Sequence, residues 1–459
     1  MALMPVTDSM FMVPESREQP MHVGGLQLFD LPDGSGKEYL AELYRQSIEV
    51  EDIAPVFRKR PYRSPLTLGQ WGWREDDAID LEHHVRHSAL PEPGRVRELL
   101  ALTSRLHGTL LDRKRPLWEA HLIEGLEGNR FAVYTKLHHA VMDGISAQRL
   151  LQRSLSPDPE SRGVPVPWAR RAATHPPREK AGFSPLALPK AALQLTGDVM
   201  GLVPTLIHLA NDGLRHQAAA LPLQAPRSMF NVGITGSRRI AAESWSMERL
   251  RKVGKAGDAT LNDVVLAMCS GALRSYLLEL DALPSSPLIA MTPVSLRKED
   301  SPDQADVSTN AVGTILCNLA TDLENPGARL VAVRASMQQG KATLAGLSST
   351  QVSALSAMVM APLLLNSVLD LHRFTPPPFN LVVSNVPGPT EPLYWNGARM
   401  SGMYPLSIPL DGQAMNITLT SYAGQMQFGI VGCRRSVPRL QRLLGHLEES
   451  LLSLEQAVL

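Results

Sequence analysis

Two adjacent histidines, followed after three residues by Asp-Gly, have the residue types and the spacing to do chemistry. Residues 138–144 read His-His-Ala-Val-Met-Asp-Gly. A histidine has an ordinary pKa of about 6.5, so its neutral ring takes a proton from a hydroxyl near pH 7. On its own, a His-His pair fits a general base, a metal ligand or a packed core residue. We therefore treat His138, His139, Asp143 and Gly144 as one candidate catalytic segment.

The surrounding sequence narrows these alternatives. No glutamate, cysteine or third histidine stands at a metal-ligand spacing from the pair, so the sequence predicts no metal. A second pair, His83 and His84, has no Asp-Gly behind it, and we interpret it as structural. Two roles stay open for Asp143. It either orients a histidine, as in a catalytic triad, or braces the loop.

A catalytic group needs a rigid mount, and the flanking residues predict one. Residues 131–137 alternate between two faces, which indicates a strand that ends at the histidines. Gly144 then allows a tight turn into a helix that carries Ile145, Ala147, Leu150 and Leu151. We expect the candidate segment to lie at the end of this strand, before the helix.

The composition suits a globular protein of two or three domains. Of 459 residues, 44% are hydrophobic, and 45 basic residues balance 45 acidic ones. A formal charge of zero gives no general attraction to nucleic acid, so we expect no nucleic-acid partner. Cys269, Cys317 and Cys433 form neither a disulfide framework nor a metal motif, which fits a reducing cytosol.

The chain divides at a proline-rich basic stretch. We predict an N-terminal domain over 1–155, a linker with a kinked amphipathic helix over 156–227, and a C-terminal domain over 228–459. The linker carries Arg170, Arg171, Arg178 and Lys180, and the helix after it either covers a domain junction or touches lipid. The uncharged stretch 342–369 is long enough to span a membrane, but its first half is polar, so we predict a buried helix.

Four further segments accompany residues 138–144 along the chain. They are Asp8 and Phe11 before Pro20-Met21-His22-Val23-Gly24-Gly25, Pro116-Leu117-Trp118-Glu119 before Leu122-Ile123-Glu124-Gly125-Leu126, Asn262-Asp263-Val264-Val265-Leu266-Ala267, and Asn385-Val386-Pro387-Gly388-Pro389. Residues 138–144 alone resemble the coenzyme A-dependent acyltransferase superfamily, which includes chloramphenicol acetyltransferases, carnitine acyltransferases and peptide condensation domains. Together, the five segments resemble one branch of it, the bacterial wax ester synthase/diacylglycerol acyltransferase family, and the resemblance runs from about residue 5 to 440.

The resemblance implies a fold and a set of roles. The fold is α/β (α+β), with two chloramphenicol-acetyltransferase-like domains, each a mixed sheet flanked by helices, and the active site in a tunnel between them. His139 is then the general base, and His138 a packing or orienting residue. Asp143 pairs with an arginine and holds the loop, although direct orientation of His139 stays open. No covalent acyl-enzyme and no cofactor are implied, because acyl-coenzyme A is itself a substrate.

Several further residues have two interpretations each. Asn262 and Asn385 are oxyanion-donor candidates, or they bond only backbone and shape a turn. We expect Pro116, Leu117 and Trp118 to pack rather than touch substrate, with Asp263 capping a helix and Pro387, Gly388 and Pro389 forming a rigid turn. Ala354, Ala357 and Ala361 share a helix face that either lines an acyl site or packs against another helix.

The expected partners are acyl-coenzyme A, a long-chain fatty alcohol or diacylglycerol, and the surface of a membrane or lipid droplet. The expected location is the cytoplasm, with peripheral attachment to the inner face of the membrane or to lipid inclusions. Two alternatives stay open. One is another coenzyme A- or carrier-dependent branch of the superfamily, including condensation-type enzymes. The other is a lipid-surface protein without catalytic activity.

Overall fold

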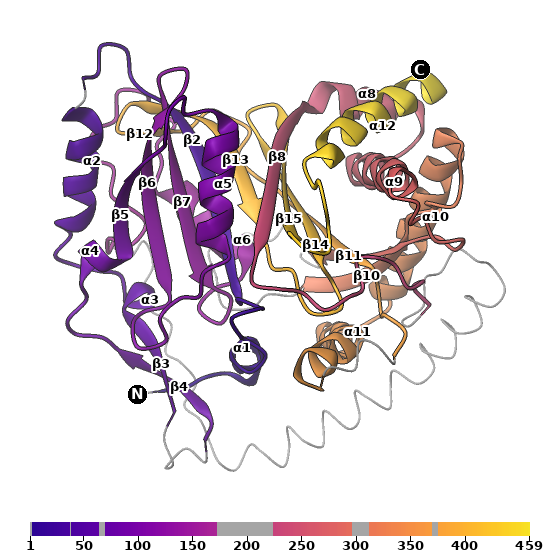
Figure 1. Cartoon of the computed structure of the whole chain (residues 1–459), viewed down its shortest axis with the longest axis horizontal. Coiled ribbons are helices and arrows are strands. Elements are labelled where there is room, and N and C mark those ends of the chain that lie inside the picture. The colour runs from indigo at the N-terminus through magenta and orange to yellow at the C-terminus, as the bar shows by residue number, and fades with distance from the viewer. Residues whose placement is uncertain (1, 37, 64–68, 172–223, 296–311, 370–374) are drawn as a thin grey trace. The chain divides into compact units, whose positions relative to one another are not determined.

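The computed structural model describes residues 2–36, 38–63, 69–171, 224–295, 312–369 and 375–459 (Figure 1). Within it the chain forms two compact units, which are described separately. Unit 1 consists of Met1–Arg171, Val232–Arg249 and Asn385–Leu444, and unit 2 of Ala172–Asn231, Leu250–Ser384 and Gly445–Leu459. The amphipathic helix predicted beyond the linker, together with Arg178 and Lys180, lies outside the described residues.

Unit 1 contains most of the strands. Its helices are α1 (Val6–Met12), α2 (Glu38–Ile48), α3 (Pro55–Arg58), α4 (Leu81–His84), α5 (Val96–His107) and α6 (Gly144–Arg153). Its strands are β1 (Ala2–Leu3), β2 (His22–Asp30), β3 (Lys59–Arg63), β4 (Trp71–Glu75), β5 (Val85–Ala89), β6 (Trp118–Leu126), β7 (Arg130–His138), β8 (Arg238–Ser246), β12 (Tyr394–Trp395), β13 (Ala398–Leu406), β14 (Met415–Tyr422) and β15 (Gln425–Cys433).

The main sheet of unit 1 holds the candidate segment. Its order is β12-β13-β2-β7-β6-β5, antiparallel except for the parallel pair β5–β6. The strand predicted over 131–137 is β7, and its last residue, His138, lies opposite His22 of β2. Helix α5 packs beside this sheet (Figure 1). The shared core contains Leu26, Leu28, Leu90, Leu99, Leu100, Ile123, Leu126, Ala132, Tyr134, Ile240, Leu406 and Val431.

Two further sheet segments complete unit 1. Strands β14 and β15 form an antiparallel hairpin, and β8 pairs antiparallel with β15. A small sheet of order β1-β4-β3 carries Trp71 and Trp73. Trp73 packs with Met12 of α1 and Ala140 of the candidate segment in one apolar cluster. The small sheet and the N-terminal helix therefore support the loop that follows β7.

Unit 1 is not one continuous stretch of chain. Strand β13 pairs with β2, although some 370 residues separate them, with Leu406 opposite Gly24. The units therefore differ from the boundaries at 155 and 228 that we predicted. Those boundaries rested on a change in composition, and composition does not report pairing between distant strands.

Unit 2 combines long helices with a three-strand segment. It contains α9 (Leu261–Glu279), β9 (Ile289–Ser295), β10 (Val312–Asn318), α10 (Pro326–Ala345) and α11 (Ser349–Leu369), and most of α8 (Met247–Ala256), β11 (Leu381–Val386) and α12 (Arg442–Val458). The first residues of α8 and α12 and the last two of β11, Asn385 and Val386, belong to unit 1. Strand β9 pairs antiparallel with β10 and parallel with β11. The predicted capping box is present: Thr260 Oγ1 accepts from the Asp263 N–H, and Asp263 Oδ2 from the Thr260 N–H at 2.9 Å.

The uncharged stretch 342–369 contains the end of α10, a break and then α11, which corrects the uninterrupted buried helix that we predicted. Gly346 is the C-cap of α10, and Ser348 precedes α11, where its hydroxyl accepts from the Gln351 N–H at 3.3 Å. Helix α11 buries one stripe, formed by Val352, Leu355, Val359 and Leu363, while Ala354 and Ala361 stay partly exposed. No helix among the described residues is long and apolar enough to cross a membrane.

Candidate active site

The candidate segment turns directly from β7 into α6. The N–H groups of Val141 and Met142 both donate to the carbonyl of His138, at 2.9 and 3.3 Å, which closes the turn. Gly144 is then the first residue of α6. It has no left-handed φ, and a Cβ atom there would meet nothing within 4 Å. The tight glycine turn that we predicted is therefore made by residues 138–142, and the structure gives no steric reason for glycine at 144.

Asp143 caps the helix that follows the histidines. Its Oδ1 accepts from the Ser146 N–H at 2.8 Å, and its Oδ2 from the Ser146 hydroxyl at 3.2 Å. An N-cap of this kind stabilises a helix by about 1 kcal/mol. Among the described residues no arginine forms an ion pair with Asp143, unlike the pairing that the resemblance implies. Its carboxylate accepts from the N–H and the hydroxyl of Ser146 instead.

His139 is a neutral base in this structure. Burial lowers the pKa of His139 to about 4, although the charge of Asp143 acts in the opposite direction. The charge of the neighbouring His138 lowers the pKa of His139 further. The ring stacks on Phe11 of α1, with centroids 3.9 Å apart and an angle of 19°. Phe11 therefore fixes the plane of the imidazole.

His138 points into the protein. Its side chain is fully buried, and its Nδ1 accepts from the Ala140 N–H at 3.1 Å. Its Nε2 lies 3.1 Å from Oε1 of Glu15, a carboxylate in the loop after α1. Since Nδ1 is the acceptor, Nε2 carries the proton and faces the carboxylate. The two histidines therefore have different surroundings. His139 is partly exposed and can exchange a proton with a substrate, whereas His138 is fully buried.

The segment Pro116-Leu117-Trp118 packs beneath the loop. Leu117 is buried in the cluster with Ala140, and its carbonyl accepts from the His138 N–H at 3.0 Å. Trp118 is buried, and its Nε1 donates to the Phe57 carbonyl at 2.9 Å. His84 stacks on Trp118 at 4.5 Å, which fits the structural role we gave to the second histidine pair.

The late Asn-Val-Pro-Gly-Pro segment is tied to the same unit through β14. The Gly388 N–H donates to Ser421 Oγ at 3.0 Å, and a Cβ atom at Gly388 would lie 2.0 Å from the Ser421 carbonyl oxygen. Only glycine permits this approach. The neighbouring Thr420 accepts from Gln148 Nε2 of α6 at 2.5 Å. Residues 385–389 and the helix that follows the histidines are therefore linked through two adjacent residues of β14.

The remaining candidates lie on two different elements. Asn385 is a partly buried residue near the end of β11, and Pro387 is exposed. Asn262 is the second residue of α9 in unit 2, also partly buried. Asp263 beside it is 2% exposed and completes the cap of α9. Asn262 stays a candidate donor to the oxyanion only because of its amide side chain. Asp263 stabilises the start of α9.

Sequence reasoning missed three residues that contact this machinery. Glu15 lies in the loop after α1, and Arg113 lies in the loop between α5 and β6. Gln148 lies on α6. None of the three stands at a periodic spacing from the histidines. The one usable signal was the position of Glu15, five residues before the Pro20–Gly25 segment that carries part of the family resemblance. Nothing in the sequence placed it beside His138.

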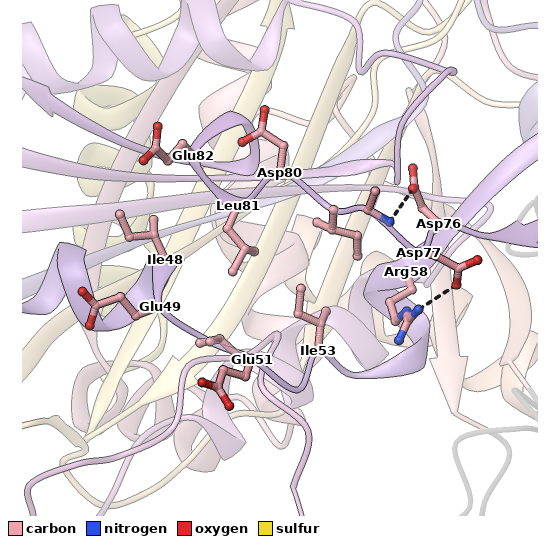
Figure 2. A pocket seen from close by; sticks show the side chains of 13 residues that line it. Ile48, Glu49, Glu51, Ile53, Arg58, Asp76, Asp77, Asp80, Leu81 and Glu82 are labelled. Atoms are coloured by element: carbon pink, nitrogen blue, oxygen red, sulfur yellow. Dashed lines mark hydrogen bonds and ion pairs between the residues drawn. The ribbon is translucent and has the colours of Figure 1, made fainter.

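A hollow of about 660 Å³ lies elsewhere on unit 1 (Figure 2). It contains no residue of the candidate segments, and Arg58, which is paired with Asp77 at 2.9 Å, is its one guanidinium. Its carboxylates belong to Glu49, Glu51, Asp76, Asp77, Asp80 and Glu82. Such a surface repels phosphate groups, so it does not suit coenzyme A. No group of three His, Cys, Asp or Glu side chains in the described ranges is arranged to hold a metal ion.

Comparison with known proteins identifies the class. A crystallised wax ester synthase/diacylglycerol acyltransferase from Marinobacter aquaeolei superposes with a TM-score of 0.80 at 41% identity, covering 100% of both chains. The first condensation domain of the CDA synthetase shares the fold alone, with a TM-score of 0.56 at 14% identity over 98% of this chain and 94% of that one. The two-domain fold, with sheets flanked by helices, is thus that of the acyltransferase and condensation-domain class, as we predicted.

The family follows from the sequence comparisons. The family's catalytic-domain model matches residues 3–265, and its C-terminal-domain model matches 308–455. A protein of Mycobacterium tuberculosis named as a probable diacylglycerol O-acyltransferase is 53% identical over 460 residues, 100% of both chains. A relative from Mycobacterium bovis with a similarly provisional name is 44% identical over 463 residues, 99% of this chain and 91% of the relative. The chain belongs to the wax ester synthase/diacylglycerol acyltransferase family and is an O-acyltransferase.

Proposed function

We propose that this enzyme moves a fatty acyl group from acyl-coenzyme A to the hydroxyl of diacylglycerol, with His139 as the general base. The observation that carries the proposal is the state of His139. Its ring is neutral at pH 7, because its pKa is lowered to about 4, and its plane is fixed against Phe11. A neutral imidazole held at a strand end is what direct proton abstraction needs.

The chemical step then needs no covalent acyl-enzyme. Nε2 of His139 takes the hydroxyl proton while the oxygen attacks the thioester carbonyl. The tetrahedral intermediate collapses, the carbon–sulfur bond breaks, and the leaving thiolate receives the proton from His139. Donors to the oxyanion contribute the larger part of such catalysis. Asn385 and Asn262 are the candidates, and Asn385 is the stronger one because its segment is tied to α6 through β14.

Two acceptors fit this chemistry, and one is favoured. The relative that is 53% identical over its full length carries a diacylglycerol O-acyltransferase name, whereas the Marinobacter protein, at 41%, carries both activities in its title. Purified enzyme offered palmitoyl-coenzyme A with equal amounts of hexadecanol and diacylglycerol should form mainly triacylglycerol. A product dominated by wax ester would reverse the assignment of the acceptor. No ester and no release of thiol would contradict the proposed function as a whole.

We further propose that the enzyme meets its lipids by peripheral attachment to an anionic surface. Each basic residue near such a surface contributes about 1 kcal/mol, so Arg170, Arg171, Arg178 and Lys180 together suffice for reversible binding. The protein should therefore sediment with vesicles of anionic lipid at low salt and leave them at high salt. Replacing all four by glutamine should move it to the supernatant without changing turnover on detergent-dispersed substrate.

The vesicle-binding experiment needs a control because Arg170 and Arg171 also make contacts within the protein. Arg170 lies 3.5 Å from a carboxylate oxygen of Asp52, and Arg171 donates to the Pro165 carbonyl at 3.1 Å. Arg170→Gln/Arg171→Gln alone tests whether these contacts, rather than surface charge, explain a loss of binding. Wild-type protein that ignores anionic vesicles at low salt would contradict peripheral attachment.

A further inference from the structure

We propose that Glu15 is a positioning residue that holds the loop around His139, acting through His138 on one side and Met21 on the other. The inference rests on the proposed function, in which His139 is the base. Glu15 is not one of the residues that carried the family resemblance, although it lies between Phe11 and Pro20, and its side chain touches no residue to which we gave a chemical step. Its hydrogen bonds with Met21 and Arg113, together with its close approach to His138, carry the inference.

One oxygen of Glu15 is linked to the backbone N–H groups of the base and of the residue after it. Oε1 accepts from the Met21 N–H at 3.3 Å, and the Met21 carbonyl accepts from the His139 N–H at 2.8 Å. The same Oε1 lies 3.1 Å from His138 Nε2, while His138 Nδ1 accepts from the Ala140 N–H at 3.1 Å. Both paths start at one atom and end on residues 139 and 140. A shift of this oxygen therefore moves the base.

The other carboxylate oxygen of Glu15, Oε2, is held by Arg113. Arg113 donates to Oε2 of Glu15 through Nε at 2.8 Å, and its terminal nitrogen donates to the Met12 carbonyl at 3.1 Å. The guanidinium lies over the ring of Trp71, 5.4 Å from its centroid. Trp71 belongs to the small sheet and packs on the cluster that contains Ala140. Glu15 is thus held by a rigid part of unit 1.

The carboxylate stays charged where it sits. Its side chain is only 2% exposed, and burial alone would raise the pKa of Glu15. Contacts with His138 and Arg113 outweigh burial, so the pKa lies below its ordinary value. A charged acceptor makes hydrogen bonds that are roughly twice as strong as neutral ones. An amide at this position has one acceptor oxygen, and it cannot serve Arg113 on one side and Met21 with His138 on the other.

The test is Glu15→Gln, which keeps the volume of the side chain. Because small misplacement of a catalytic group costs up to about 100-fold, we expect kcat to fall about 10-fold at nearly constant KM, with palmitoyl-coenzyme A and diacylglycerol as substrates. The pair Glu15→Gln/His138→Ala should be no slower than the slower single variant, since both act through one network. If the loss of kcat in the double variant equals the product of the two single losses, the inference is overturned.

Two measurements separate positioning from general stability and from the proposed function. Glu119 is a matched control, a buried carboxylate 3.1 Å from Lys136 Nζ. Glu119→Gln should lower the melting temperature at least as much as Glu15→Gln while kcat stays unchanged. In NMR titrations, the His139 ring should titrate nearer its ordinary pKa in Glu15→Gln and not in Glu119→Gln. An inactive His139→Ala beside a fully active Glu15→Gln would overturn only this inference, whereas an active His139→Ala would overturn the proposed function.

Discussion

Replacing His139 by alanine should lower turnover by about 100-fold or more while the protein still folds. Positioned general-base catalysis contributes roughly 10²- to 10⁴-fold, and His139 is the residue to which we assign this role. The substitution removes a partly exposed ring that stacks on Phe11, so the loss of packing is small. The measurement is release of free thiol from acyl-coenzyme A by purified protein, with circular dichroism to check the fold.

The companion variants test the division of roles. His138→Ala should cost less turnover than His139→Ala, because His138 acts through the scaffold, but it should cost more stability, because its side chain is fully buried. Asp143→Asn keeps an N-cap side chain and should retain most activity, in line with a bracing role. Equal and small losses at both histidines would remove the base from the mechanism.

Lowering the pH from 7.5 to 5 should markedly lower the free energy of unfolding of unit 1. Burial lowers the pKa of His107 to about 3 and that of His139 to about 4, and it lowers the pKa of His22 as well. These rings are neutral in the folded protein but gain protons below about pH 6.5 when it unfolds. Stability is therefore complete above pH 6.5 and falls as the pH approaches the folded values.

The expected loss of unfolding free energy is large enough to measure. Each histidine with such a shift removes about 2 kcal/mol between pH 7.5 and 5, against a total stability of about 5–15 kcal/mol for a domain. All six tryptophans lie in unit 1, so their fluorescence during urea unfolding reports on that unit. His107→Gln should reduce the pH dependence by about 2 kcal/mol, whatever its stability at pH 7.5. A urea midpoint that does not move between the two pH values would contradict the neutral burial of these rings.

Local patterns were enough to place several elements and the base. Alternation over 131–137 predicted the strand that the structure has at Arg130–His138, and Thr260 with Asp263 predicted the start of α9. Both signals are local, since strand alternation and helix capping depend on residues within one or two turns. The same holds for the His-His-x-x-x-Asp-Gly segment, whose residues are all neighbours in the chain. Its resemblance to the family added the fold class.

What the sequence by itself determined is therefore the identity of the chemical groups and the elements that carry them. The tertiary structure alone decided which surroundings those groups have. It placed Glu15 beside His138, Phe11 on His139 and Ser421 against Gly388, and it joined β13 to β2 within unit 1. These contacts link residues from 33 to 382 positions apart, and no local periodicity reports them. The low pKa of His139 has the same origin, because burial is a property of the folded chain and not of the residue.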